Sequence, residues 1–381
     1  MKKQSSPIRL LNQGTYGCIF RPGINCLGKI ESNSAYITKI QNDIKTSKNE
    51  YEIGKQIQKI PLWKKMYSPI LTNCPISIGK IKDDAIEACN VIQKHKSKTF
   101  VSNKLRYVGK DTLEPYLLQY LSDKSSDFLK KMFQSHLYLL NSFDRLVDQK
   151  IVHYDCKENN IMYDPKLRLP IIIDFGLSFS VDQLTSYSAY KNVFYTYYDK
   201  YPPWCLDIVI ISFLIREYAI YIQEHNTGGN NSGGKGTKKA DNPILPNEKT
   251  ESTVWEMTID YNILIEVVNH YFQENHIIQQ IKKENSTFVG EYKEKWAKYI
   301  KDQYSGKKGE YVIQHLMESW KSWDNFAVSV MYYYILQNSD ELMKQTAVKD
   351  YKQVLFENIL SLPMNRDVPS VTINKIQHII L

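Results

Sequence analysis

Two short segments in the middle of the chain carry residue types suited to phosphoryl transfer. Residues 153–160 read HYDCKENN, and Asp174 begins the triplet Asp-Phe-Gly a short distance further on. Phosphoryl transfer needs a carboxylate that orients the attacking hydroxyl and accepts its proton, and Asp155 is a candidate for this role. It also needs oxygen ligands for Mg²⁺, which the amide of Asn160 and the carboxylate of Asp174 can supply. The sequence therefore offers one candidate for each role.

These segments resemble the catalytic loop and the metal-binding turn of the protein-kinase family, which read H-R-D-L-K-x-x-N and D-F-G. The resemblance implies that Asp155 is the catalytic base, that Lys157 contacts the γ-phosphate, and that Asn160 and Asp174 bind Mg²⁺, or Mn²⁺ in its place. It implies ATP as the phosphoryl donor. Lys157 also favours serine and threonine over tyrosine as acceptors in a protein substrate. As a short and divergent member of the family, the chain resembles the kinases of large DNA viruses.

A glycine-containing turn near the N-terminus resembles the phosphate-binding loop of the same family. Residues 11–20 read LNQGTYGCIF and lie between two strand-like runs. Glycine is needed where backbone approaches a triphosphate, because a Cβ would collide with it. Asn12 stands where the family pattern has its first glycine. We expect the following residues to contact ATP: Gly14, Thr15, Tyr16, Gly17 and Ile19.

The family anchors the phosphates through a lysine on the third strand, which pairs with a glutamate on the following helix. Lys39 is flanked by strand-like residues on both sides, and strand alternation puts Ile37 on its face. The resemblance implies that Ile37 lies above the adenine. Glu50 and Glu52 are both available as partners of Lys39. At about 100° per residue, Glu50 lies on the apolar face of the predicted helix at 48–60 and is the better candidate.

A small sheet followed by helices must position these residues. Strands are expected at 8–11, 18–20, 35–41, 160–163 and 170–174, and helices at 48–60, 113–148, 254–280, 292–302 and 311–337. This pattern predicts an α+β fold, and the resemblance implies a bilobal kinase-like arrangement. The β-rich N-lobe is expected at residues 1–109 and the larger helical C-lobe at 110–381. Residues 225–252 are rich in Gly, Asn, Ser and Lys, which predicts a flexible surface insertion.

The segment after Asp174 departs from the family pattern. The A-P-E triplet that closes the kinase activation segment is absent, although Asp207 suits the aspartate at the start of the buried central helix of the C-lobe. Tyr154 replaces the arginine that precedes the catalytic aspartate. If Glu50 is the partner of Lys39, Gly54 stands where the family packs a large apolar residue.

Composition and charge limit the partners and the cellular location that we expect. The formal charge of +8 is spread along the chain without a basic arm, so a dedicated nucleic-acid surface is not expected. Six cysteines without a CxxC pair predict reduced thiols, and the N-terminus lacks the apolar core of a signal peptide. We therefore expect an intracellular, cytoplasmic protein, in the host cytoplasm or the virion if viral.

The apolar stretch at 208–222 contains Arg216 and Glu217 and predicts a buried helix instead of a membrane span. A monomer is expected.

Two alternative functions remain open. A small-molecule phosphotransferase of the aminoglycoside or choline kinase type shares the H-x-D-x-x-x-x-N spacing, but these enzymes usually lack counterparts of Lys157 and Gly176. A non-catalytic pseudokinase scaffold is the second alternative, although every primary catalytic position has a candidate residue. Acceptor tests with choline or antibiotics distinguish the first, and a thermal shift that requires both Mg²⁺ and ATP distinguishes the second.

Overall fold

The computed structural model describes residues 8–14, 17–81, 83–95, 99–121, 125–227, 251–338 and 345–380. The chain divides into two compact units, and each is considered by itself. Unit 1 comprises Met1–Val181, Met331–Lys349 and Pro369–Leu381, and unit 2 comprises Asp182–Val330 and Asp350–Val368. The predicted lobe boundary at residues 109 and 110 lies inside unit 1, and it stays a prediction.

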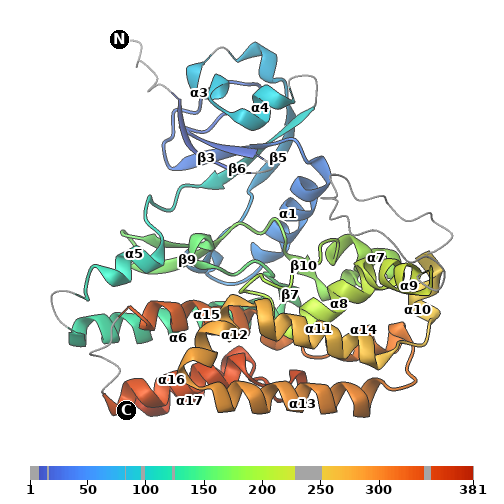
Figure 1. The fold of residues 1–381 in the computed structure, drawn as a ribbon. Helices are drawn as coiled ribbons and strands as arrows, with labels where there is room; N and C mark the ends of the chain where they lie inside the picture. The colour runs from blue at the N-terminus through green and yellow to red at the C-terminus, as the bar shows by residue number, and fades with distance from the viewer. Residues whose placement is uncertain are drawn as a thin grey trace, which may run out of the picture. The chain divides into compact units, whose positions relative to one another are not determined.

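Unit 1 begins with a five-stranded antiparallel sheet in the order β1-β2-β3-β6-β5 (Figure 1). The strands are β1 (Arg9–Gln13), β2 (Gly17–Arg21), β3 (Tyr36–Gln41), β6 (Phe100–Arg106) and β5 (Thr72–Ile76). Alternation along the strands separates two faces. Lys39 lies opposite Ile19 in the register, while Cys18 lies opposite Ile40 on the other face. The sheet therefore presents one face to the candidate site and the other to a small core.

Helices cover both faces of this sheet (Figure 1). Helix α1 (Ile44–Ile57) begins at Asp43, whose side chain caps the backbone N–H of Thr46, and it packs against β5 and β6. On the other face lie η1 (Ile78–Lys80), α3 (Asp84–Glu87) and α4 (Asn90–Lys94). Their apolar residues form the small core with β2 and β3: Ile8, Cys18, Phe20, Ile24, Ile40, Ile76, Ile86, Cys89, Val91, Ile92 and Phe100.

The rest of unit 1 holds the catalytic-loop sequence between short strands. Parallel β4 (Tyr67–Ser68) and antiparallel β8 (Ile161–Asp164) flank β9 (Leu169–Ile173), while β7 (Ile151–Val152) pairs with β10 (Phe179–Ser180). Strands β8 and β9 confirm those expected at 160–163 and 170–174, and they pair as an antiparallel hairpin. The helices of this part are α2 (Trp63–Met66), α5 (Leu113–Leu118), α6 (Ser125–Asp148) and α17 (Pro369–Ile380).

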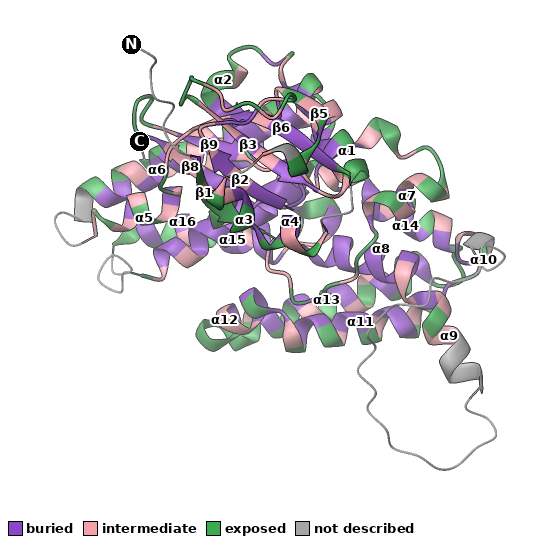
Figure 2. Cartoon of the chain, turned by 90° about the horizontal axis from the view of Figure 1, so that it is seen from above, coloured by how far each residue is buried: buried purple, intermediate pink, exposed green. Residues whose placement is uncertain are grey.

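Unit 2 is helical in its described residues apart from short connections. Its elements are η3 (Val181–Gln183), α7 (Tyr187–Val193), α8 (Leu206–Arg216), α9 (Tyr218–Thr227), α10 (Glu251–Glu256), α11 (Tyr261–Glu274), α12 (His276–Glu284), α13 (Ser286–Tyr304) and α14 (Gly309–Met317). Helices α15 (Trp323–Leu336) and α16 (Thr346–Ile359) contribute residues to both units. Residues 206–215 of α8 are all buried (Figure 2), which confirms the first part of the buried helix predicted at 208–222. Residues 218–222 of that stretch belong to α9, in which Ile220 is exposed, so the prediction was wrong for this part.

Several expectations need correction. The helix predicted at 254–280 is three helices, because Asp260 and Asn275 cap the starts of α11 and α12 with their side chains. Helix α9 extends to Thr227 and α10 begins at Glu251, so both ends of the predicted insertion are helical. Residues 228–250 of that insertion lie outside the described residues. The α+β class, with a small N-terminal sheet followed by mainly helical structure, is confirmed.

The predicted reduced state of the cysteines is wrong for four of the six. Cys18 is bonded to Cys89 and Cys26 to Cys74, whereas Cys156 and Cys205 are buried and form no disulfide. The partners of each disulfide are far apart in the sequence, so spacing alone did not suggest the pairs. The intracellular location was inferred partly from reduced thiols and stays a prediction. Among the described residues, no helix is long and apolar enough to cross a membrane.

Candidate active site

Lys39 connects the sheet, helix α1 and the Asp-Phe-Gly turn. Its Nζ lies 3.1 Å from Glu50 Oε2 and 2.8 Å from Asp174 Oδ1. Glu50 is buried on the inner face of α1, whereas Glu52 points away and pairs with Lys55 at 2.7 Å. The structure therefore brings together three of the predicted site residues from a strand, a helix and a turn.

Burial and charge act in opposite directions on this cluster. Burial alone would lower the pKa of Lys39, but Glu50 and Asp174 outweigh it, so the pKa is raised and the ammonium is retained. Burial likewise works to raise the pKa of Asp174, but Lys39 outweighs it and the pKa is lowered. For Glu50 burial dominates over Lys39 and raises the pKa to about 7. The cluster thus holds a permanent cation beside an ionised Asp174.

The catalytic-loop residues form a second group. Lys157 Nζ donates to Asp155 Oδ1 at 3.0 Å, and Asn160 Nδ2 donates to Asp155 Oδ2 at 2.9 Å. Asn160 also donates to the backbone oxygen of Asp155 at 2.8 Å. These contacts fix the Asp155 carboxylate from both sides. Because both hydrogens of the Asn160 amide are used within the loop, its Oδ1 is the atom that can face a cation.

Contacts through His153 fasten the catalytic loop to the Asp-Phe-Gly turn. His153 Nε2 lies 3.0 Å from the backbone oxygen of Ile173, and Ser178 Oγ donates to the backbone oxygen of His153 at 2.9 Å. The His153 ring also packs edge-on against Phe175, with ring centroids 5.0 Å apart. Asp174 has a φ of 59°, a left-handed conformation that is uncommon for a residue other than glycine. These contacts hold the turn that aims the Asp174 carboxylate at Lys39.

Sequence reasoning missed Tyr67 in the support of this turn. Tyr67 is fully buried, packs edge-on against Phe175 at 6.2 Å, and donates from its hydroxyl to the backbone oxygen of Ser142. On α1, Gly54 permits close packing, since a Cβ there would lie 2.7 Å from the backbone oxygen of Ile70. The missing side chain at Gly54, noticed in the sequence, was the available clue that the helix approaches backbone here.

The glycine turn has one open and one crowded glycine. A Cβ at Gly14 would meet nothing within 4 Å, whereas a Cβ at Gly17 would lie 2.4 Å from the backbone oxygen of Ile40. Glycine is therefore required at Gly17 by packing on β3, a reason other than the approach of phosphates. Ile19 and Ile37 are half-buried on the face of Lys39. The predicted contact residues Thr15 and Tyr16 lie outside the described residues.

The donor set fits Mg²⁺ bound together with phosphates. Asp174 is 43% exposed in its side chain and supplies a carboxylate, and Asn160 supplies an amide oxygen. Over the described ranges, no group of three or more His, Cys, Asp and Glu side chains is placed to hold a metal ion by itself. Proteins usually bind Mg²⁺ through one or two carboxylates, while substrate phosphates and water complete the shell.

No protein-family model matches the sequence, and no curated protein matches it. Among solved structures, the chain is similar to the Cydia pomonella granulovirus kinase PK-1, with 14% identity and a TM-score of 0.33. That match covers 56% of this chain and 69% of the granulovirus chain. The chain is also similar to a Stt7 homologue from Micromonas algae, with 15% identity and a TM-score of 0.34 over 46% of this chain and 51% of that one.

Proposed function

We propose that the chain is a Mg²⁺-ATP-dependent protein kinase that phosphorylates serine or threonine. The observation that carries this proposal is the position of Lys39 between Glu50 and Asp174. Lys39 is half-buried and its charge is already balanced by these two carboxylates, so the fold does not require a further anionic partner. Such a lysine beside a partly exposed aspartate suits the anchoring of phosphate oxygens next to a metal ligand.

Each residue has a role that follows from its contacts. Asp155 orients the acceptor hydroxyl and takes its proton, and its carboxylate is held for this by Lys157 and Asn160. Lys157 can shift from Asp155 toward the γ-phosphate, because its side chain is 32% exposed. Bound Mg²⁺ would neutralise charge on the phosphates, and Asn160 and Asp174 are the residues that would hold it.

On the nucleotide side, the same proposal assigns the sheet face around Lys39. Lys39 anchors the phosphates, Ile19 and Ile37 supply an apolar surface for the adenine, and Gly14 leaves room for the phosphates beside the turn. Glu50 keeps Lys39 in place from the helix side. This arrangement supports a protein kinase over a scaffold, because a scaffold has no requirement for an intact lysine, base and metal-ligand set.

A labelled-ATP assay tests the proposal. The protein is incubated with Mg²⁺ and γ-labelled ATP on casein and basic proteins, and in parallel on choline and aminoglycosides. We expect label on protein serine or threonine, loss of transfer in Asp155→Asn, and full transfer in the matched control Asp148→Asn on α6. Label on tyrosine would overturn the assigned specificity. Label on the small molecules only, or on nothing, would overturn the protein-kinase assignment.

A further inference from the structure

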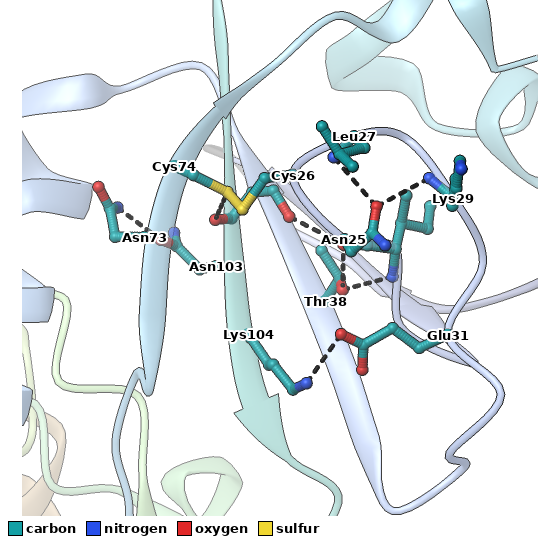
Figure 3. Close-up of a disulfide and its surroundings, with 12 residues drawn as sticks. Asn25, Cys26, Leu27, Lys29, Glu31, Thr38, Asn73, Cys74, Asn103 and Lys104 are labelled. Carbon is teal, nitrogen blue, oxygen red and sulfur yellow. Dashed lines mark hydrogen bonds and ion pairs between the residues drawn. A yellow bond between two sulfur atoms is a disulfide. The ribbon is translucent and has the colours of Figure 1, made fainter.

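The two disulfides of unit 1 lie at different distances from the glycine turn. Cys18–Cys89 joins β2 to the residue before α4, and both cysteines are fully buried in the small core. Cys26–Cys74 joins the connection after β2 to β5 near the surface, where Cys26 is exposed (Figure 3). Of the two disulfides, only Cys18–Cys89 includes a residue that directly follows the glycine turn.

Both ends of the glycine turn are fastened to the same short segment. Cys18 directly follows Gly17 and lies opposite Gln13 in the register of β1 and β2. While Cys18 is bonded to Cys89, the side-chain oxygen of Gln13 accepts a hydrogen bond of 3.2 Å from the backbone N–H of Asn90. One covalent bond and one hydrogen bond therefore tie the two flanks of the turn to two consecutive residues.

These ties lie on the face of the sheet that the candidate site does not use. Cys18 points into the small core, and Ile19 and Lys39 point to the opposite face. Across the turn, the N–H of Gly14 donates to the backbone oxygen of Gly17 at 2.9 Å. Gln13 and Cys18, the described flanks of the turn, are thus held from the far face of the sheet, while a Cβ at Gly14 would meet nothing within 4 Å.

We propose that the Cys18–Cys89 disulfide, together with the Gln13–Asn90 hydrogen bond, positions the glycine turn for nucleotide phosphates. This inference rests on the proposed function, in which ATP binds at this turn. Flanks that are fixed before binding lose less conformational freedom when phosphates dock between them, so the cross-link raises nucleotide affinity. Cys18, Cys89 and Gln13 are positioning residues, and nucleotide affinity depends on the oxidised state of the first pair.

The second disulfide provides a matched control within the same unit. The view of Cys26–Cys74 in Figure 3 includes Asn25, Thr38 and the Glu31–Lys104 ion pair, and neither cysteine adjoins the glycine turn at 14–17 in the sequence. The two disulfides have sequence separations of 71 and 48, so each restricts the unfolded chain by a similar amount. Loss of either bond lowers stability, but only loss of Cys18–Cys89 releases a residue that flanks the turn.

The test compares Cys18→Ala/Cys89→Ala with Cys26→Ala/Cys74→Ala in the full chain, well below the melting temperature of each. Calorimetry gives the Kd for Mg²⁺-ATP, and steady-state kinetics give kcat and the KM for ATP and for the protein substrate. For the first variant we expect Kd and the KM for ATP to rise by roughly tenfold, with kcat and the other KM little changed. For the second variant we expect wild-type values of all four quantities.

Reduction of the disulfides in the wild-type protein provides a second, independent test. Dithiothreitol reduces each disulfide to two thiols and is itself oxidised to its cyclic disulfide. The exposed Cys26–Cys74 bond should open first, without a change in Kd, and Kd should rise only when the buried Cys18–Cys89 bond opens. Alkylation followed by mass spectrometry identifies which bond is open, and reoxidation should restore the affinity.

The outcomes separate this inference from the proposed function. If oxidised wild-type protein does not bind Mg²⁺-ATP, the proposed function and this inference both fail. If it binds, and the Cys18→Ala/Cys89→Ala variant has the same Kd, only the positioning role fails. Should that variant not fold, Gln13→Ala decides the question. It keeps both disulfides, and an unchanged Kd there would overturn the inference, whereas a rise of a few fold would support it.

Discussion

The carboxylate of Asp207 and the guanidinium of Arg366 form a doubly hydrogen-bonded ion pair in which neither side chain is exposed to solvent. Both hydrogen bonds are 2.9 Å long, and the residues are 159 positions apart in the sequence. Ser319 and Trp323 also donate to Asp207. Burial works to raise the pKa of Asp207, but Arg366 outweighs it and the pKa is lowered.

Removing one member of this pair should strongly destabilise unit 2. Arg366→Met leaves a buried carboxylate without its counter-charge, which costs about 3–5 kcal/mol in free energy of unfolding. Because the pKa of Asp207 is lowered on folding, its stabilisation is present above the unfolded pKa and is lost as the pH falls. Urea unfolding at pH 7 and at acidic pH measures both effects. The exposed pair Lys200–Glu274 is the control, and Lys200→Met should change stability little.

The raised pKa of Glu50 predicts an acid limit to activity. Below a pH of about 7, Glu50 takes up a proton and Lys39 loses one of its two carboxylate partners. We expect kcat/KM to fall as the pH drops through this value. The Glu50→Gln variant should be less active than wild type, and its kcat/KM should not show this fall at acidic pH. An acid limb in wild type located instead near pH 4.5 would contradict the raised pKa.

The same shift has a consequence of opposite sign for stability. A carboxyl whose folded pKa is raised contributes stability below its unfolded pKa, and that contribution is lost as the pH rises through the folded pKa. For Glu50 the window extends from its ordinary value of 4.5 to about 7. The melting temperature of Glu50→Gln relative to wild type should therefore increase across this window. Thermal melts at pH 4.5 and pH 8 provide the measurement.

Substitutions of Asp174 and Asp155 should affect different steps, namely the binding of Mg²⁺-ATP and the transfer of phosphate. Asp174→Asn removes a carboxylate that pairs with Lys39 and is expected to abolish transfer by weakening Mg²⁺-ATP binding. Asp155→Ala should lower kcat while the Kd for Mg²⁺-ATP stays near that of wild type. Calorimetry and the labelled-ATP assay measure the two quantities. Near-wild-type activity in Asp174→Asn would be incompatible with the kinase assignment.

Gly54→Ala should destabilise the protein, although alanine normally favours a helix more than glycine does. Replacing an exposed helical glycine with alanine stabilises a helix by up to about 1 kcal/mol. At Gly54 the new Cβ would lie 2.7 Å from the backbone oxygen of Ile70, so we expect Gly54→Ala to destabilise by roughly 1–3 kcal/mol. Gly290 in α13 has nothing within 4 Å of its Cβ position, and Gly290→Ala should stabilise. Denaturant melts of both variants show whether the signs differ.

Tyr154 predicts an enzyme that is active without phosphorylation. The family uses an arginine at this position to hold a phosphate in the activation segment, a contact that a guanidinium makes well. Tyr154 is instead buried, with its ring edge-on to Phe179 at 5.5 Å. We expect phosphatase treatment to change the rate less than about tenfold, since one charge-assisted contact contributes roughly 1.5–3 kcal/mol. Inert dephosphorylated protein, reactivated by phosphate on Thr185, Ser186 or Tyr187, would refute this interpretation.

The sequence by itself determined the features that depend on short-range spacing. Asp155 and Asn160 lie within one loop, and the hairpin that leads from this loop to Asp174 is contiguous with it, so local pattern was sufficient. The family resemblance called for a lysine on a strand and a glutamate on the next helix. Strand-like neighbours selected Lys39, and helical periodicity selected Glu50 over Glu52. The structure brings Glu50 and Asp174 each within contact distance of Lys39.

Only the tertiary structure decided which distant residues meet. The partners of Cys18 and of Asp207 are 71 and 159 positions away, and no local preference selects them among the other cysteines and arginines. The tertiary structure also explains why residue 17 is glycine, because the carbonyl of Ile40 on the neighbouring strand occupies the space that a side chain would need. Such contacts arise from how elements approach each other in space, which periodicity along the chain does not encode.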